Sequence, residues 1–182
     1  NITHYGMSLQ DNVINEIFKK LEKTSNYKKR YLEIKKYNKK NKYKKKGLAI
    51  TPVKFGISFT TIHLNQAGAL VHIYTDGSVH LNHGGIEMGQ GTHTKIAQLV
   101  ANSFGLPYNL VHISSTNTSK VPNTSASAAS STTDLNGAAA LNAVSKIKFN
   151  LEKFIKKKYK IYNYQAEYRD QHIIFGNQNF EF

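Results

Sequence analysis

Apolar residues near the start of the chain recur three or four positions apart, which is the spacing of a helix. Five of them fall on one helical face: Val13, Ile14, Ile17, Phe18 and Leu21. In front of them, Ser8 and Asp11 resemble a capping box, in which two side chains close the first helical turn. We therefore predict an amphipathic helix over residues 9–23 and a weaker second helix over 27–37. Residues 38–46 are almost all polar and predict a solvated connector.

After the connector the apolar positions alternate, and a period of two is typical of strands. The pattern predicts strands over residues 47–51 and 54–61. Two further strands, over 69–75 and 78–82, flank Asp76-Gly77, a dipeptide that favours a hairpin turn.

The rest of the chain switches between helical and strand periods and contains no internal repeats. It predicts, in order, a helix over 92–104, a short strand over 110–114, a long helix from 134 to about 159, and a last strand over 171–175 before a Gly-Asn turn. Because helices and strands are mixed along the chain, the predicted fold class is α+β. The pattern divides the chain into a helical lead-in with a lysine-rich connector (1–46) and an α+β segment (47–182).

The composition excludes several classes of protein. With 182 residues the chain has the length of one ordinary domain, and no apolar run is long enough to cross a bilayer. The sequence contains no cysteine, which rules out disulfides, thiolate zinc sites, cysteine nucleophiles and iron–sulfur clusters held by this chain. The polar start lacks a signal peptide and an initiator methionine, so we expect residue 1 to lie inside a longer polypeptide or a processed product. The absence of cysteine fits a cytoplasmic setting.

The net charge of +14 raises the question of nucleic-acid binding, and the distribution of charge argues against it. Residues 1–54 hold 15 lysines and arginines against 4 acids, whereas residues 55–145 hold 2 against 3. Only two of the 25 cations are arginines, the side chain whose planar fork recognises phosphates and bases. We interpret the lysines as solvated surface and keep a lysine-rich nucleic-acid-binding protein as an alternative.

Four glycines crowd into residues 84–91, between a predicted strand and a predicted helix. Such a loop exposes free backbone N–H groups at the positive end of a helix and so predicts an anion site. Its glycine spacing matches neither a P-loop nor a dinucleotide fingerprint, and a tight turn without a ligand is the alternative. We expect Glu87, the acid in this loop, to cap or orient it rather than to act as a general base.

A second segment, residues 120–134, consists mostly of small and hydroxylated residues and leads into the long helix. Its hydroxyls and N–H groups predict further donors for an anionic ligand, with a flexible linker and N-cap as the alternative. Its length favours binding, because long irregular loops in compact domains are usually functional. Ser130 and Ser131 lack the Gly-x-Ser-x-Gly setting of a serine nucleophile.

The eight histidines do not form a recognised metal motif. His72 and His80 lie on the two strands of the predicted hairpin and can face one another, while His83 and His93 flank the glycine loop. None has the His-Glu-x-x-His spacing of a zinc site, so we predict no metal site made of histidines alone.

Five blocks in a fixed order resemble the molybdenum-binding subunit of the xanthine dehydrogenases, in the xanthine oxidase and aldehyde oxidase family. The blocks are Lys54–Thr60, Leu64–Leu70, Tyr74–Ser78, the glycine loop 84–91 and residues 121–134. The lead-in as far as Leu21 is also similar to bacterial members, and the similarity is loose after about residue 148. The resemblance implies a middle fragment of that subunit and part of its molybdenum-cofactor-binding domain, which is an α+β fold.

The resemblance also implies roles for individual residues. Phe59 would pack against a purine, and Thr60 would contact the substrate through its hydroxyl. The residues implied for binding molybdenum–molybdopterin are Met88, Gly89, Gln90, Gly91, Ala128, Ala129, Ser130 and Thr132. Ala129 would sit beside the molybdenum, and Thr132 stands where the family often has serine. The absence of cysteine agrees with a metal whose sulfur comes from the dithiolene of the cofactor.

The implied activity is that of an oxidoreductase of purine catabolism, which hydroxylates hypoxanthine and xanthine toward urate with water. Electrons would pass through [2Fe-2S] clusters and FAD, in a partner subunit or other modules, to NAD. The general-base glutamate and substrate-clamping arginine of the family match no residue of this chain. The isolated fragment is therefore expected to be inactive and to work within a hetero-oligomer. A decayed subunit kept for subunit contacts is the alternative, and the preference among xanthine, hypoxanthine and aldehydes is open.

Overall fold

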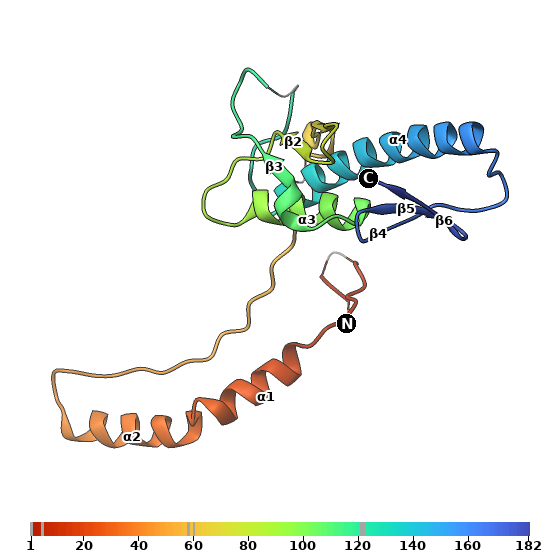
Figure 1. Ribbon diagram of the computed structural model, residues 1–182. Coiled ribbons are helices and arrows are strands. Elements are labelled where there is room, and N and C mark those ends of the chain that lie inside the picture. The colour runs from red at the N-terminus through yellow and green to blue at the C-terminus, as the bar shows by residue number, and fades with distance from the viewer. Residues whose placement is uncertain (1, 5, 58, 60, 121–122) are drawn as a thin grey trace. The chain divides into compact units, whose positions relative to one another are not determined.

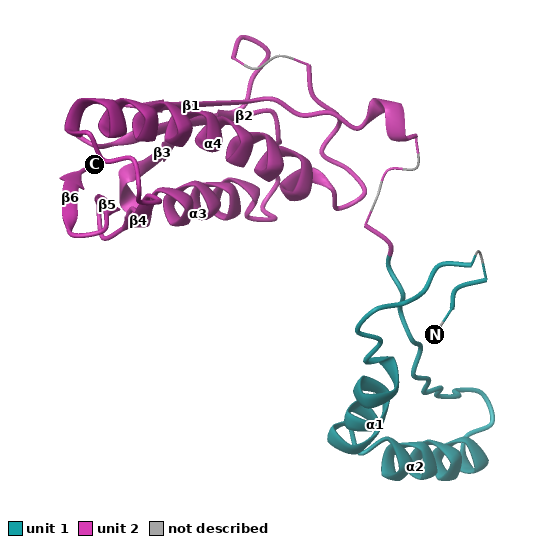
Figure 2. Ribbon diagram, turned by 90° about the vertical axis from the view of Figure 1, so that its right-hand side faces the viewer, with its two compact units in different colours: residues 1–55 teal, residues 56–182 magenta. Residues whose placement is uncertain are grey.

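The structure of the protein is a computed structural model that describes residues 2–4, 6–57, 59, 61–120 and 123–182. The chain folds into two compact units, residues 1–55 and 56–182 (Figure 2). The first unit is helical, and the second combines helices with two small sheets (Figure 1). Within the described residues, no helix combines the length and apolar character that crossing a bilayer requires.

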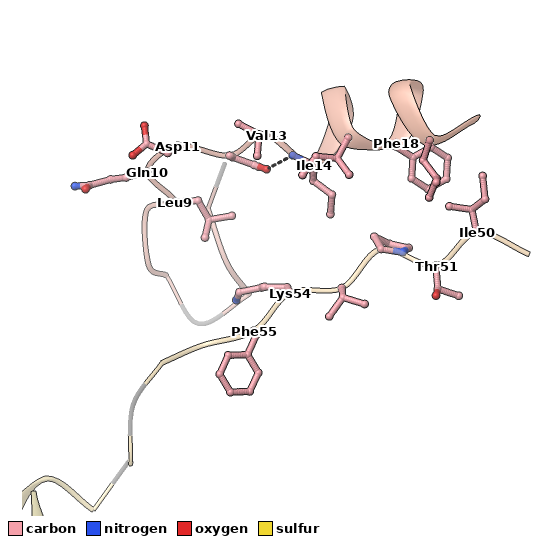
Figure 3. A pocket seen from close by; sticks show the side chains of 15 residues that line it. Leu9, Gln10, Asp11, Val13, Ile14, Phe18, Ile50, Thr51, Lys54 and Phe55 are labelled. Carbon is pink, nitrogen blue, oxygen red and sulfur yellow. Dashed lines mark hydrogen bonds between the residues drawn. The ribbon is translucent and has the colours of Figure 1, made fainter. Parts of the chain in front are cut away.

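Two helices make up the regular part of the first unit: α1, Ile14–Thr24, and α2, Tyr27–Lys40. The apolar face of α1 and the extended segment 50–55 line a cavity of about 550 Å³. Phe18 of α1 is one of the side chains that line it (Figure 3). Both predicted helices are present. The second runs further than expected, into the stretch predicted as a connector.

The predicted capping box does not form, and α1 accordingly begins later than expected. Ser8 pairs instead with Ile2 in an isolated antiparallel bridge, and Asp11 adopts a left-handed φ of 50°. The N–H of Ile14 donates to the Asn12 side chain at 3.2 Å. With this local side-chain contact at its start, α1 begins at Ile14, five residues after the predicted start at residue 9.

The strands predicted over 47–51 and 54–61 are absent from the described residues of these segments. Phe55 and Ile57, two of the alternating apolar residues, are 66% and 61% exposed. A strand needs a neighbouring strand to satisfy its backbone hydrogen bonds. Within the described part of the chain, neither segment is paired with a strand. This prediction is wrong because the period of two reports alternation and not the presence of a partner.

The second unit is built on a three-stranded sheet with β2 in the middle. β1, Ala69–Ile73, and β2, Val79–His83, form the predicted antiparallel hairpin, and β3, Val111–Ile113, pairs in parallel with β2. The register places His72 opposite His80, so the expectation that these side chains occupy facing positions is confirmed.

Two helices pack on one face of this sheet and on each other. α3, Thr92–Phe104, matches its predicted bounds, and α4, Thr132–Tyr159, begins slightly before its predicted start. A Cβ on Gly137 of α4 would lie 2.9 Å from Leu99 Cδ1 of α3, so a glycine there allows the two helices to approach closely. The buried core consists of Val71, Val79, Leu81, Ile96, Ala97, Val100, Ala101, Phe104, Leu106, Val111, Ala140 and Val144.

A second sheet follows α4 and consists of β4, Glu167–Arg169, β5, His172–Phe175, and β6, Gln178–Glu181. All neighbours in it are antiparallel. β5 is the predicted last strand, whereas β4 and β6 were not predicted, because they are short and mostly polar. The sheet and the end of α4 enclose a small core of Ile155, Ile161, Ile173 and Phe175. The predicted α+β class is confirmed.

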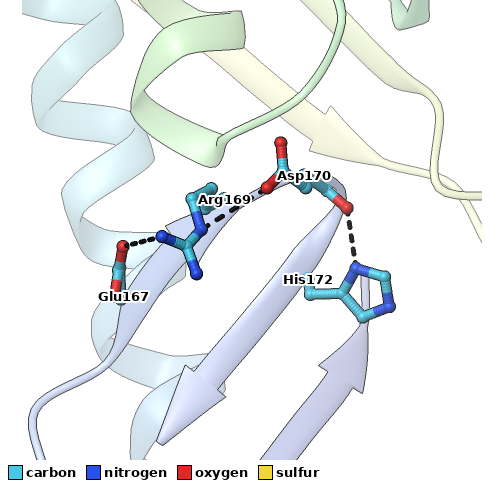
Figure 4. Close-up of polar contacts among 4 residues, drawn as sticks. All are labelled: Glu167, Arg169, Asp170 and His172. Carbon is cyan, nitrogen blue, oxygen red and sulfur yellow. Dashed lines mark hydrogen bonds and ion pairs between the residues drawn. The ribbon is translucent and has the colours of Figure 1, made fainter.

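The turn between β4 and β5 carries polar contacts on its surface (Figure 4). Arg169 lies 3.4 Å from a carboxylate oxygen of Glu167 and 3.4 Å from one of Asp170. His172 Nδ1 lies 2.7 Å from the carbonyl oxygen of Asp170. The charged side chains of this cluster are exposed, so its ion pairs contribute little to stability.

Candidate functional site

The glycine loop, residues 84–91, is closed by the carboxylate of Glu87. Its Oε1 accepts hydrogen bonds from the N–H groups of Gly89 and Gly91, both at 2.9 Å, and its Oε2 accepts one from His93 at 3.0 Å. These bonds, that from His93 first, lower the pKa of Glu87 to about 2. A charged carboxylate therefore caps the positive end of α3, which confirms the predicted capping role.

Two histidines join the ends of the same loop. The N–H of Gly85 donates to His83 Nδ1 at 3.1 Å, and His83 Nε2 lies 3.0 Å from His93 Nδ1. Burial, and then the charge of His93, lower the pKa of His83 to about 4. His83 is fully buried and neutral, and it holds the start of the loop against the first turn of α3.

The second segment, of which residues 120 and 123–134 are described, packs directly on the first two glycines of the loop. A Cβ on Gly84 would lie 2.5 Å from Thr124 Cγ2, and a Cβ on Gly85 would lie 2.7 Å from Thr132 Cγ2. The N–H of Gly84 also donates to Asn136 Oδ1 of α4 at 3.1 Å. These glycines thus allow the two segments to touch, a role that the sequence did not distinguish from ligand binding.

The second segment turns sharply before α4. Ala129 and Ser130 have φ angles of 51° and 55°, in the left-handed region that residues other than glycine rarely adopt. The N–H of Ser131 donates to the Ala128 carbonyl at 3.1 Å and closes the turn. Backbone strain of this kind is retained where the surrounding structure over-determines it, most often at binding sites.

The starts of α3 and α4 together line a cavity of about 410 Å³. The glycine loop and α3 contribute Met88, Gln90, Thr92 and Lys95, and the second segment and α4 contribute Ser127, Ala128, Ala129, Ser130, Thr132 and Thr133. The structure therefore brings six of the residues implied for cofactor binding to one cavity. The other two, Gly89 and Gly91, shape the loop with φ angles of 98° and 75° and do not line the cavity.

Gln90 lines the cavity, but its side-chain amide bonds to its own loop. Its Oε1 accepts the N–H of Met88 at 2.6 Å, and its Nε2 donates to the Ile86 carbonyl at 2.8 Å. Lys95 Nζ donates to the Gln90 carbonyl at 3.0 Å. In this arrangement Gln90 fixes the shape of the loop, and its predicted hydrogen bonds to a cofactor stay a prediction.

Phe59 lines a second cavity, of about 380 Å³, which borders the first. Both cavities have Ala128 in their walls. The Asn65 side chain donates to the Phe59 carbonyl at 2.9 Å and so fixes the backbone of the aromatic residue. Thr60, the other residue implied for substrate contact, lies outside the described residues.

Three hydrogen bonds that the sequence did not reveal attach residues 64–66, which follow Phe59, to the second segment. The N–H of Gln66 donates to Ser125 Oγ at 2.7 Å, and the N–H of Ser125 donates to the Gln66 carbonyl at 2.8 Å. The hydroxyl of Ser125 also donates to the Leu64 carbonyl. These residues are far apart in sequence, and polar pairs of this kind carry no periodic signal.

The described part of the chain contains no group of three or more His, Cys, Asp or Glu side chains placed to hold a metal ion. Of the lining residues, Lys95 is the one charged side chain at the first cavity, and no carboxylate lines it. A cavity with hydroxyls, helix N-termini and a cation at its walls suits an anionic, oxygen-rich ligand.

Comparison with known proteins identifies what this arrangement is similar to. The sequence model of the molybdopterin cofactor-binding domain matches residues 20–182. Xanthine dehydrogenase 1 of Arabidopsis thaliana is 48% identical over 157 residues, which are 86% of this chain and 12% of the plant protein. Xanthine dehydrogenase/oxidase of Mus musculus is likewise 48% identical over 157 residues, with the same coverage. The chain thus spans about an eighth of the length of these curated relatives.

Two solved structures are similar to this chain in fold. The CO dehydrogenase of Oligotropha carboxidovorans superimposes on 62% of this chain, and on 14% of that chain, with a TM-score of 0.56 and 26% identity. Quinoline 2-oxidoreductase of Pseudomonas putida 86 covers 100% of this chain, and 24% of its own chain, with a TM-score of 0.71. At 15% identity the latter shows the fold alone. The chain belongs to the molybdopterin cofactor-binding domain family.

Proposed function

We propose that this chain is the part of a xanthine dehydrogenase that binds molybdenum–molybdopterin and one wall of the purine site. The observation that carries the proposal is the cavity that Met88 and Gln90 share with Ala128, Ala129, Ser130 and Thr132. The 48% identity to xanthine dehydrogenases supports a purine substrate, hypoxanthine or xanthine, and oxidation toward urate. Because the chain spans a small part of those enzymes, the activity belongs to the whole protein.

The residues present fit an anionic pyranopterin. Molybdopterin supplies, when bound, a dithiolene for the metal and a phosphate, and the metal accepts the electrons of the oxidation. The hydroxyls of Ser127, Ser130, Thr132 and Thr133 line the cavity, and no carboxylate lines it that would repel an anion. Lys95 supplies a positive charge. Thr92, also on the wall, has a buried hydroxyl without a partner among the described residues.

The wall between the two cavities suits a substrate placed close to the cofactor. Ala128 lines both cavities, and Ala129 beside it lines the first, so small side chains separate them. In the proposed role Phe59 presents its ring to the face of a purine, an arrangement favoured between flat π systems. Thr60 would contribute a hydrogen bond to the same substrate. Ala129 would lie beside the molybdenum without binding it, because its side chain offers no donor atom.

No catalytic acid or base is assigned to the described residues. Glu87 is occupied by three N–H groups and is not available to take a proton from substrate or water. We propose that the general base and the substrate-clamping arginine come from other parts of the protein. The [2Fe-2S] clusters, FAD and NAD site would belong to a partner subunit or further modules of a cytoplasmic hetero-oligomer, and this chain alone would be inactive.

A segment exchange tests the proposal. The matching 157 residues of Arabidopsis xanthine dehydrogenase 1 are replaced by those of this chain, and bound molybdopterin and urate formation from xanthine are measured. We expect both to be retained. Loss of molybdopterin would support a decayed, non-catalytic subunit. Bound molybdopterin without urate formation would refute the substrate assignment and leave the cofactor assignment intact.

A further inference from the structure

Four buried side-chain atoms of the described residues lack a hydrogen-bond partner: Ser25 Oγ, Asn65 Oδ1, Asn82 Oδ1 and Thr92 Oγ1. Asn65 lines the Phe59 cavity, and Thr92 lines the cavity between α3 and α4. Thr92 is 1% exposed, so bulk water does not satisfy its hydroxyl. Buried polar groups are nearly always paired, and an exception at the wall of a cavity calls for a partner that enters the cavity.

The surroundings of Thr92 leave its hydroxyl no role inside the fold. Thr92 is the first residue of α3, but the cap of that helix is formed by Glu87, whose oxygens accept the N–H groups of Gly89, Gly91 and His93. No side chain at the N-cap position, Gly91, competes with it. A hydroxyl that served as a structural cap would bond to one of these N–H groups, and this one does not.

The positive charge near Thr92 indicates which kind of ligand atom its hydroxyl would meet. Lys95, one helical turn further along α3, lines the same cavity, and Thr132 lines it from the first residue of α4. Two helix N-termini and an ammonium group favour an electron-rich oxygen at this position, and a hydroxyl beside such an oxygen acts as a donor.

We propose that, when molybdopterin fills this cavity, the Thr92 hydroxyl turns to it and donates a hydrogen bond to one of its oxygens. Thr92 is then a cofactor-binding residue in addition to the eight that the resemblance implied. This inference rests on the proposed function, because it presumes that the ligand of the cavity is molybdopterin. It predicts that the hydroxyl opposes stability without the cofactor and helps to retain the cofactor.

Three variants of the full polypeptide test the inference. Thr92→Val keeps the shape of the side chain and removes the hydroxyl, and Thr92→Ser keeps the hydroxyl. Thr94→Val makes the same change at an exposed threonine of the same helix, outside the cavity. Each protein is produced with and without molybdopterin synthesis in the host. The readouts are bound pterin per polypeptide, from the fluorescence of the oxidised released pterin, and the midpoint of thermal unfolding.

We expect Thr92→Val to raise the unfolding midpoint of the cofactor-free protein and to lower bound pterin about tenfold, the effect of losing one hydrogen bond to a charged group. Thr92→Ser should retain the pterin, and Thr94→Val should match the parent. Normal pterin content in Thr92→Val, or a lower unfolding midpoint of its cofactor-free form, would overturn the inference while the parent still binds pterin. A parent without pterin would refute the proposed function itself, and the inference with it.

Discussion

The Nε2 atom of His83 lies 3.0 Å from the Nδ1 atom of His93, and this contact joins the two ends of the glycine loop. Because the N–H of Gly85 donates to His83 Nδ1, the proton of the neutral His83 ring sits on Nε2 and points to His93. The loop that carries Met88 and Gln90 to the cavity therefore depends on an uncharged His83.

The neutral state of His83 predicts a stability that depends on pH. In the folded chain its pKa falls from 6.5 to about 4, chiefly through burial. The unfolded chain takes up this proton at a higher pH than the folded chain. The free energy of unfolding therefore falls as the pH drops from about 6.5 to about 4. Above that window the contribution of the neutral His83 to stability is fully present. The loss approaches about 3 kcal/mol, since one pKa unit is worth about 1.4 kcal/mol.

Urea unfolding of the chain at neutral pH and near the lower end of the window measures this dependence. His83→Gln removes the titrating group and should flatten it. His72→Gln changes an exposed histidine on the edge strand β1 and should leave it intact. An unchanged pH dependence in His83→Gln would show that another group causes it.

The carboxylate of Glu87 predicts a second effect, on the shape of the loop. Glu87→Gln keeps one oxygen acceptor but replaces the other with an amide that cannot accept, so at least one of the three N–H groups loses its partner. We expect bound molybdopterin in the full polypeptide to fall several-fold, because the loop that lines the cavity loosens. Glu16→Gln, in the exposed first turn of α1, is the matched control and should bind as the parent does. Equal pterin content in the two variants would contradict an organising role for Glu87.

The sequence predicts those elements of the fold whose apolar residues meet the core at a regular spacing. The bounds of α3 were predicted correctly because one face of that helix carries Ile96, Val100 and Phe104 at helical spacing and meets the core. The strands predicted over 47–51 and 54–61 failed because alternation does not supply a pairing partner. The short strands β4 and β6 were missed because their residues are mostly polar.

The candidate site was predictable to a similar, limited extent. The glycine loop and the Ser/Ala segment were each identified as helix entrances, and the family resemblance joined them in one site. The packing of Thr124 on Gly84 and the bonds between Gln66 and Ser125 depend on distances across the fold. No spacing in the sequence encodes such contacts, so the structure was needed to find them.

The positions of Gln90 and Phe59 predict different defects. Gln90 lines the first cavity and bonds to Met88 and Ile86, so Gln90→Ala should lower the molybdopterin content of the full polypeptide. Phe59 lines the neighbouring cavity, so Phe59→Ala should keep the cofactor and raise KM for xanthine or lower kcat. Pterin fluorescence and steady-state rates per bound pterin separate the two. Equal loss of cofactor in both variants would refute this division of roles.

The contact between Gly84 and Thr124 predicts a rescue. In Gly84→Ala the new methyl group would lie 2.5 Å from Thr124 Cγ2, closer than atoms can pack, so one of the two segments must shift. We expect a loss of about 1–3 kcal/mol in the free energy of unfolding, the usual cost of overpacking. Gly47→Ala, where a Cβ meets no atom within 4 Å, should cost far less.

Thr124→Gly removes all the side-chain atoms that the new methyl group would meet, including the Thr124 Cβ at 2.6 Å, which an alanine would keep. In the double variant Gly84→Ala, Thr124→Gly we therefore expect part of the loss to be recovered, with a coupling energy of about 1 kcal/mol. Urea unfolding of the parent, the two single variants and the double variant measures this coupling directly. Strict additivity would mean that the two segments do not press on each other at this point. Gly84 and Gly85 would then have to be explained by the anion site that the sequence predicts for this loop.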